Sequence, residues 1–168
     1  MNNKLIIAAI LGLAAGMGMA GGREPAPAPR FTVQADTNCV LDNRTGLIWA
    51  RNASLFGKLE WGAAITNCAT LSYGGRSDWR LPGSRELDSL MDARFVGPAL
   101  CNTAGDGKWA ENDPFTGVQS EGYYWTSSEW EVEPVFAWGL YMVYGSLFYT
   151  YKAGSCHVWP VRGELRAG

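Results

Sequence analysis

The chain has 168 residues, with 14 basic and 16 acidic side chains and a formal net charge of −2. This near-balance excludes the strongly basic surface of a nucleic-acid-binding protein, so no nucleic-acid partner is expected. The chain contains eight Trp, seven Tyr and six Phe, more than half of them beyond residue 120. That concentration predicts a contact surface, because Tyr and Trp supply large, rigid contact area.

Residues 1–20 have the layout of a secretory signal peptide. A polar start carrying Lys4 precedes an apolar run from Leu5 to Ala20 that ends in small residues. The run is about 16 residues long, shorter than the roughly 20 that a membrane-spanning helix needs. We therefore expect cleavage after Ala20 and an exported protein without a membrane span in its mature form. Its location would be the periplasm, the cell surface or the medium.

The rest of the chain divides into a linker and one domain. Pro and Ala alternate within residues 21–37, and such sequences stay extended and do not pack. This segment is predicted to be a linker and lead-in. Residues 38–164 have the usual size of one domain with its own core.

Two regular elements are predicted in the first part of the domain. Apolar residues flank a turn within Val40–Arg51, which predicts a β-hairpin. Glu60–Leu71 is predicted to be a helix, because its apolar residues recur at helical spacing. These residues are Trp61, Ala64, Ile65, Cys68 and Leu71.

A short strand and a second helix are expected next. The strand covers Asp78–Leu81, and the helix covers Ser84–Asp92 with Gly83 or Ser84 as its N-cap. Residues 96–121 are rich in Gly, Pro, Asn and Asp. They predict a long irregular loop, a kind of segment that is usually functional or poorly ordered.

The last third of the domain is predicted to be β-structure. Four strands are expected over Tyr123–Ser128, Ala137–Val143, Leu147–Lys152 and Val158–Val161, with an acidic loop over Glu129–Val135. The order of hairpin, two helices and C-terminal antiparallel sheet predicts an α+β fold.

Alternation along these strands separates inward from outward side chains. It places Trp138, Leu140, Met142 and Leu147 in the core and Tyr141 and Phe148 outside. Trp125 and Trp159 are also expected to be core residues.

The four cysteines are Cys39, Cys68, Cys101 and Cys156. An even number in an exported chain favours two disulfides, and the spacings match no zinc pattern. Three pairings are open. We expect Cys39–Cys68, which ties the hairpin to the first helix, and Cys101–Cys156, which ties the long loop to the sheet.

Seven motifs in order carry a family resemblance. The motifs are Asp42–Trp49, Asp78–Pro82, Arg85–Leu87, Phe115–Ser120, Tyr124–Ser128, Ala137–Trp138 and Val158–Arg162. Together they resemble a bacterial domain family typified by the C-terminal domain of the Legionella collagen-like adhesin, over about residues 38–163.

The resemblance implies a C-type-lectin-like fold, related to formylglycine-generating-enzyme domains and to the variable proteins of diversity-generating retroelements. C-type lectins link the first helix to the terminal strand, which makes Cys68–Cys156 the alternative disulfide. The adhesin is a surface protein that binds sulfated glycans and forms a trimer through a collagen stalk. This chain has no Gly-X-Y repeat, so that route to a trimer is missing.

The sequence contains little that would support an enzyme active site or a metal site. The single histidine, His157, cannot build a histidine metal site, and no Gly-x-Ser-x-Gly elbow is present. Glu133-Pro134-Val135 lacks the third ligand of a calcium-dependent lectin, and calcium needs six to eight oxygens. We expect no enzyme, no cofactor and no metal, and we expect Asp106, Glu111 and Asp113 to lie in a solvated loop.

The charged motif residues are expected to be structural. Asp78 and Arg80 would pair with backbone or with each other, while Trp79 and Leu81 pack in the core. Arg162 would be buried with a carboxylate partner.

The leading hypothesis is a secreted module that binds a surface glycan or a protein ligand through outward aromatic residues, since an exposed patch of that size marks an interaction site. A retroelement variable protein is a sharper version, and a structural envelope or matrix protein without a dedicated ligand is the alternative. Some rings could instead pack under the 96–121 loop. The candidate residues are Trp130, Phe136, Tyr141, Tyr144, Phe148, Tyr149, Tyr151 and His157.

Overall fold

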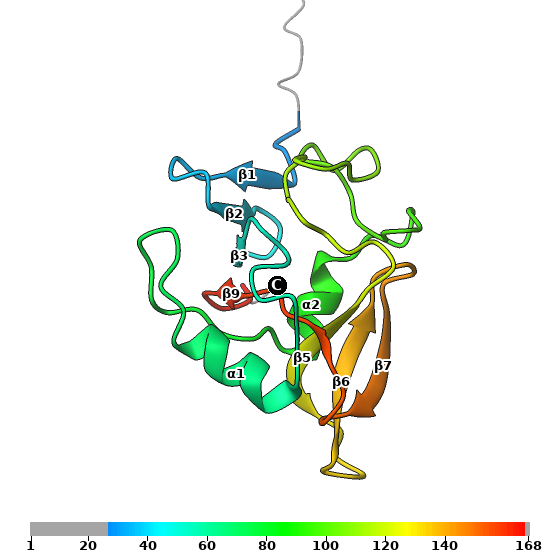
Figure 1. Ribbon diagram of the computed structural model, residues 1–168. Coiled ribbons are helices and arrows are strands. Elements are labelled where there is room, and N and C mark those ends of the chain that lie inside the picture. The colour runs from blue at the N-terminus through cyan, green and yellow to red at the C-terminus, as the bar shows by residue number, and fades with distance from the viewer. Residues whose placement is uncertain (1–26, 167–168) are drawn as a thin grey trace, which may run out of the picture.

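The computed structural model describes residues 27–166, so the expected signal peptide and its cleavage site lie outside the described residues. The strands are β1 (Phe31–Val33), β2 (Cys39–Asp42), β3 (Ile48–Ala50), β4 (Lys58–Leu59), β5 (Tyr123–Glu129), β6 (Phe136–Tyr141), β7 (Ser146–Tyr151), β8 (Cys156–His157) and β9 (Val161–Arg162), and the helices are α1 (Trp61–Ala69) and α2 (Ser84–Leu90). Figure 1 shows the sheet of β1, β2, β3 and β9 and helix α1 on one side, β5 to β7 on the other, and α2 between them. The predicted α+β fold with its hairpin, two helices and C-terminal sheet is confirmed.

The first sheet joins the two ends of the domain in the order β1-β2-β3-β9. The predicted hairpin is its centre, with Val40 opposite Trp49. Strand β1 lies in the segment expected to be a lead-in, and its Phe31 is fully buried. The domain therefore begins to pack at Phe31.

The helices follow their sequence patterns. In α1 the apolar stripe buries Ala64 and Cys68. Helix α2 has Gly83 as its N-cap, and the Glu86 carboxylate accepts a hydrogen bond from the Gly83 N–H at 2.8 Å. That bond satisfies one of the free N–H groups at the start of the helix.

The second sheet has the order β4-β8-β5-β6-β7, and its β5-β6-β7 meander matches the prediction. Two other strand predictions are wrong. Val158–Val161 is not one strand, because β8 of the second sheet ends at His157 and only Val161 of the predicted run lies in a strand, β9 of the first sheet. Asp78–Leu81 makes only a single bridge, between Arg80 and Val161.

The 96–121 loop packs into the core. Its Leu100 and Phe115 are fully buried, and the Phe115 ring lies 5.1 Å from Phe31 and 4.9 Å from Trp159 between ring centroids. The loop therefore closes the larger core cluster, whose central aromatic residues are Phe31, Trp49, Phe115, Tyr124 and Trp159.

The β5-β6-β7 sheet is covered diagonally. On the face that carries Leu140, α2 packs near Leu140, whereas Trp138 at the other end is only half-buried. On the opposite face, which carries Trp125, α1 packs over Trp125 and Ala137. We call these the Leu140 face and the Trp125 face. Each face leaves one end of the sheet uncovered.

Gly139 of β6 leaves room for the ring of Phe148 of β7. A Cβ atom on Gly139 would lie 2.7 Å from Cζ of Phe148 and 3.0 Å from the Tyr124 carbonyl oxygen. Gly139→Ala is expected to destabilise the domain by about 1–3 kcal/mol through overpacking, measured by denaturant unfolding.

The matched control for that substitution is Gly62→Ala in α1, where nothing lies within 4 Å of the added Cβ. It should be neutral or stabilise by up to about 1 kcal/mol, because Ala favours helix more than Gly does. Equal effects of the two substitutions would show that packing of the Phe148 ring does not require the absence of a side chain at Gly139.

Candidate functional site

The predicted ligand residues other than His157 fall into two groups on opposite faces of the β5-β6-β7 sheet. Directly opposite residues of an antiparallel pair share a face, and Phe136 pairs with Tyr151 while Trp138 pairs with Tyr149. These four lie on the Leu140 face. The second group, around Tyr141, lies on the Trp125 face.

The Trp130 cluster comprises Trp130, Phe136, Trp138, Tyr149 and Tyr151. The Trp130 and Tyr149 rings are stacked, with centroids 4.1 Å apart and an interplanar angle of 7°. Phe136 meets Trp130, Tyr149 and Tyr151 edge-on at 5.7 to 5.8 Å. Tyr149 and Tyr151 are 50% and 52% exposed, so the packed rings still offer an open apolar surface.

A cavity of about 340 Å³ adjoins the Trp130 cluster. Trp130 and Trp138 form its apolar wall, and the Ser128 hydroxyl lies 3.2 Å from the Ser84 hydroxyl within it. Aromatic faces beside a few convergent polar groups are the usual composition of a ligand pocket. The other lining residues are Glu129, Glu131 and Val132.

The Tyr123 cluster comprises Tyr123, Tyr141, Tyr144 and Phe148. Tyr123 stacks on Tyr141 at 4.5 Å between centroids and meets the Phe148 ring edge-on at 4.8 Å. Tyr144 meets Tyr141 at 5.8 Å. Tyr123 is absent from the sequence-based set, although alternation opposite the buried Tyr124 could have identified it.

His157 belongs to neither cluster. It lies on β8, with its ring 5.4 Å from the Tyr124 ring, and its Nδ1 atom has no hydrogen-bond partner among the described residues. Burial lowers its pKa below the ordinary value. His157 lines a separate cavity of about 350 Å³ together with Lys58 and Gln119.

Two inward assignments from strand alternation are wrong. Trp138 is half-buried in the Trp130 cluster, and Leu147 is 40% exposed. Both lie on the same face as the buried Leu140, Trp138 toward the end of that face away from α2 and Leu147 on the edge strand β7. Leu140, Met142, Trp125 and Trp159 are fully buried as predicted.

All four cysteines are buried free thiols in the structure. Cys39 and Cys101 lie in the larger core cluster, whereas Cys68 and Cys156 lie in the smaller one. Each expected disulfide would therefore join different clusters, whereas the two cysteines of the alternative pair, Cys68 and Cys156, lie in the same cluster. Burial raises the pKa of Cys68 to about 12 and that of Cys156 to about 11, so both remain protonated at neutral pH.

The charged motif residues make structural ion pairs. Arg162 is paired with Asp78 at 2.7 Å, which confirms the expected carboxylate partner. Arg80 is paired with Glu86 at 2.6 Å and not with Asp78. Bonding to Arg162 lowers the pKa of Asp78, and these pairs attach β9 and α2 to the segment between the helices.

The acidic residues of the long loop accept hydrogen bonds within that loop. Asp106 accepts from Asn102 at 2.9 Å, Glu111 from the Gly117 N–H at 2.9 Å, and Asp113 from the Thr103 N–H at 2.9 Å. Within residues 27–166, no three His, Cys, Asp or Glu side chains are grouped so that they could hold a metal ion.

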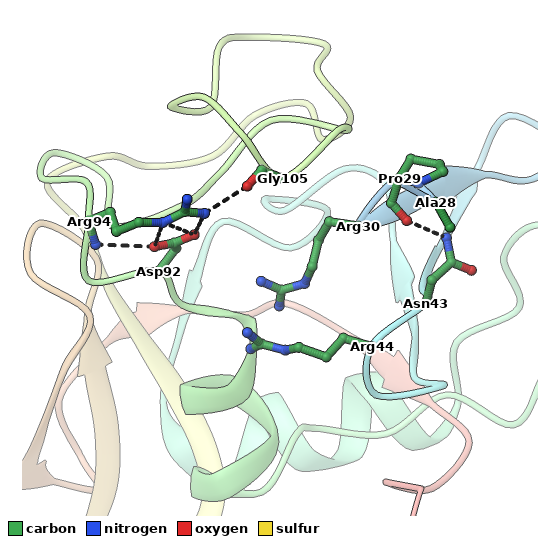
Figure 2. Close-up of a pocket in the computed structure, with 8 residues that line it drawn as sticks. All are labelled: Ala28, Pro29, Arg30, Asn43, Arg44, Asp92, Arg94 and Gly105. Atoms are coloured by element: carbon green, nitrogen blue, oxygen red, sulfur yellow. Dashed lines mark hydrogen bonds and ion pairs between the residues drawn. The ribbon is translucent and has the colours of Figure 1, made fainter. Parts of the chain in front are cut away.

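A third concave region, of about 430 Å³, is lined by three arginines (Figure 2). Arg30 is paired at 3.0 Å with the fully buried Asp42 and donates to the Ser89 carbonyl at 2.9 Å. Arg44 also donates to the Ser89 carbonyl. Arg94 is paired with Asp92 and donates to the Gly105 carbonyl at 2.7 Å. The guanidinium groups thus hold the end of α2 and the long loop together.

The Arg30–Asp42 pair should be essential for stability. Asp42→Ala leaves the Arg30 charge buried without its partner, so the free energy of unfolding is expected to fall by about 3–5 kcal/mol. Chemical denaturation measures this change.

Asp92→Ala is the matched control, because its partner Arg94 is exposed to solvent. Exposed ion pairs contribute within about 1 kcal/mol. A loss for Asp42→Ala as small as that of the control would contradict a structural role for the buried pair.

Comparison with known families identifies the domain. The Lcl C-terminal domain family matches residues 38–162, which is more than half of the chain. A search among curated proteins finds no match. None of the helices within residues 27–166 has the length and apolar character to cross a membrane.

Proposed function

Since the chain belongs to the Lcl C-terminal domain family, we propose that it is an exported, non-catalytic module that binds a surface glycan or a protein ligand. The family is adhesin-related, which fits a surface or exported location. The proposed binding site is the Trp130 cluster with its adjoining cavity. The observation that carries this proposal is the stack of the half-buried Trp130 on the exposed Tyr149 beside hydroxyl and carboxylate groups.

The Trp130 cluster is organised before any ligand binds. Its rings already contact one another at 4.1 to 6.1 Å between centroids, so binding would immobilise few additional side chains. Reducing that ordering cost raises affinity for a given contact area. A flat apolar group, such as one face of a sugar ring or a protein side chain, would contact Trp130, while its polar groups reach Ser84 and Ser128.

The charged residues around the Trp130 cluster limit which ligands it could bind. The loop that carries Trp130 also carries Glu131 and Glu133, and Glu129 lies at the rim of the cavity. Lys152 neutralises Glu129 at 2.9 Å, whereas the exposed carboxylates of Glu131 and Glu133 have no ion-pair partner within residues 27–166. An anionic ligand would be repelled there, so the proposed ligand is neutral or basic.

The retroelement hypothesis rests on the same strands. Exposed positions such as Tyr149 and Tyr151 alternate with positions that face the opposite side of the sheet, which would let surface residues vary on a constant scaffold. Sequencing the surrounding DNA tests it. A neighbouring reverse transcriptase gene with a template repeat of the 3′ end supports diversification, and their absence refutes it.

Trp130→Ala tests the proposed site. The substitution is expected to weaken ligand binding by about tenfold or more, as removal of an aromatic anchor does at other interfaces. Binding would be measured on an array of neutral, basic and sulfated glycans and by pull-down from cell surfaces.

Tyr123→Ala is the control, because Tyr123 is equally aromatic but lies on the opposite face. Both variants should remain folded in thermal unfolding. Equal binding by Trp130→Ala and the unsubstituted chain would overturn the proposed site. Absence of any ligand for the unsubstituted chain would favour the structural envelope role.

A further inference from the structure

Strand β7 is an unprotected sheet edge. It is the outer strand of the five-stranded sheet, and no other strand of residues 27–166 lies beyond it (Figure 1). Its six residues include no charge and no proline, and it pairs with β6 in unbroken register. Natural proteins usually protect edges with charges, proline or bulges. The opposite edge, β4, has only two residues and carries Lys58.

The outward backbone groups of β7 can be assigned from the ladder. Residues that exchange hydrogen bonds alternate along an antiparallel pair, and the Lys152 N–H donates to the Val135 carbonyl at 2.9 Å, in register with β6 and β7. The even-numbered residues of β7 therefore bond to β6. The N–H groups of Leu147, Tyr149 and Tyr151 point away from the sheet.

We propose that β7 pairs antiparallel with β7 of a second copy of this chain, around a two-fold axis at Tyr149. Tyr149 is the middle one of the three outward residues. Tyr149 would lie opposite Tyr149 of the second copy, and Leu147 would lie opposite Tyr151 of the second copy. The two five-stranded sheets would become one continuous sheet.

The chemistry of the strand favours a second copy as the occupant. Like charges directly opposite each other destabilise strand pairing, and β7 has none. Lys152, which follows the strand, is already paired with Glu129. The opposed side chains would be aromatic and aliphatic, which are stabilising cross-strand partners.

Pairing would also place both binding surfaces together. In this antiparallel pair the Leu140 faces of both copies lie on the same side of the joined sheet. The two Trp130 clusters would therefore lie on one side, and together they would bind a repetitive surface with increased avidity. This consequence rests on the proposed function, whereas the pairing itself does not.

The first test is the mass of the full chain in sedimentation velocity experiments over a range of concentrations. The unsubstituted chain is expected to change from monomer to dimer as concentration rises. Leu147→Pro removes an outward N–H that β6 does not use, a site where an edge strand tolerates proline. It should weaken self-association about tenfold or more.

Leu147→Ala is the matched control, since it shortens the same side chain but keeps the N–H donor. It should associate more strongly than Leu147→Pro, and circular dichroism would verify that both remain folded. A chain that stays monomeric at all concentrations, or a dimer that Leu147→Pro leaves unchanged, would overturn the proposal. A monomer found with a foreign peptide along β7 would replace the second copy with another occupant and overturn it equally.

Cross-linking tests the two-fold axis directly. Hydrogen-bonded partners in an antiparallel pair have Cα atoms about 5.5 Å apart, which is within disulfide range. Tyr149→Cys should therefore form a covalent dimer on mild oxidation, and the native cysteines are buried. Tyr144→Cys is the control, because Tyr144 is 61% exposed but lies in the turn before β7. Equal cross-linking of both variants would contradict the axis.

Discussion

The contacts of the Trp159 side chain hold the two sheets and the long loop in one domain. Its indole N–H donates to the Ala50 carbonyl of β3 at 2.8 Å, and its ring lies 5.6 Å from Tyr124 of β5 and 4.9 Å from Phe115 of the loop. Trp159 itself connects β8 of one sheet to β9 of the other. A smaller side chain there would leave a cavity shared by three parts of the chain, so the packing of the two sheets and the loop against one another depends on this ring.

The diagonal cover of the β5-β6-β7 sheet follows from that arrangement. The larger core cluster holds α2 against one end of the Leu140 face, and the smaller cluster holds α1 against the opposite end of the Trp125 face. At the end of each face that no helix covers, the backbone of the sheet would be open to solvent unless large side chains lay over it. The Trp130 and Tyr123 clusters occupy these two ends, and their mutual ring contacts let them remain half-exposed without collapsing into the core.

Local patterns predict the elements whose formation depends on neighbours in sequence, namely the hairpin, both helices and the meander. They do not predict features that distant contacts decide. The Val158–Val161 run is apolar throughout, but its first three residues connect β8 of one sheet to β9 of the other, and the Trp159 side chain of this connection is buried in the core. Trp138 follows the alternation of Leu140, yet its burial depends on how far α2 reaches. The aromatic residues of the site other than Trp138 could be named from the sequence, whereas the division of the candidate residues between two faces required the strand register.

The arginine-lined region and the cavity beside the Trp130 cluster differ in their unpaired charge, and this difference bears on ligand selectivity. The arginine-lined region is more basic than the chain as a whole, but Arg30 and Arg94 are neutralised by Asp42 and Asp92, and Arg44 binds a helix carbonyl. Those guanidinium groups are occupied in holding the fold. The exposed carboxylates of Glu131 and Glu133 beside the Trp130 cluster, by contrast, form no ion pair within residues 27–166. Unpaired charge is therefore negative where the aromatic surface is open, and electrostatic selection among ligands would act there against anions.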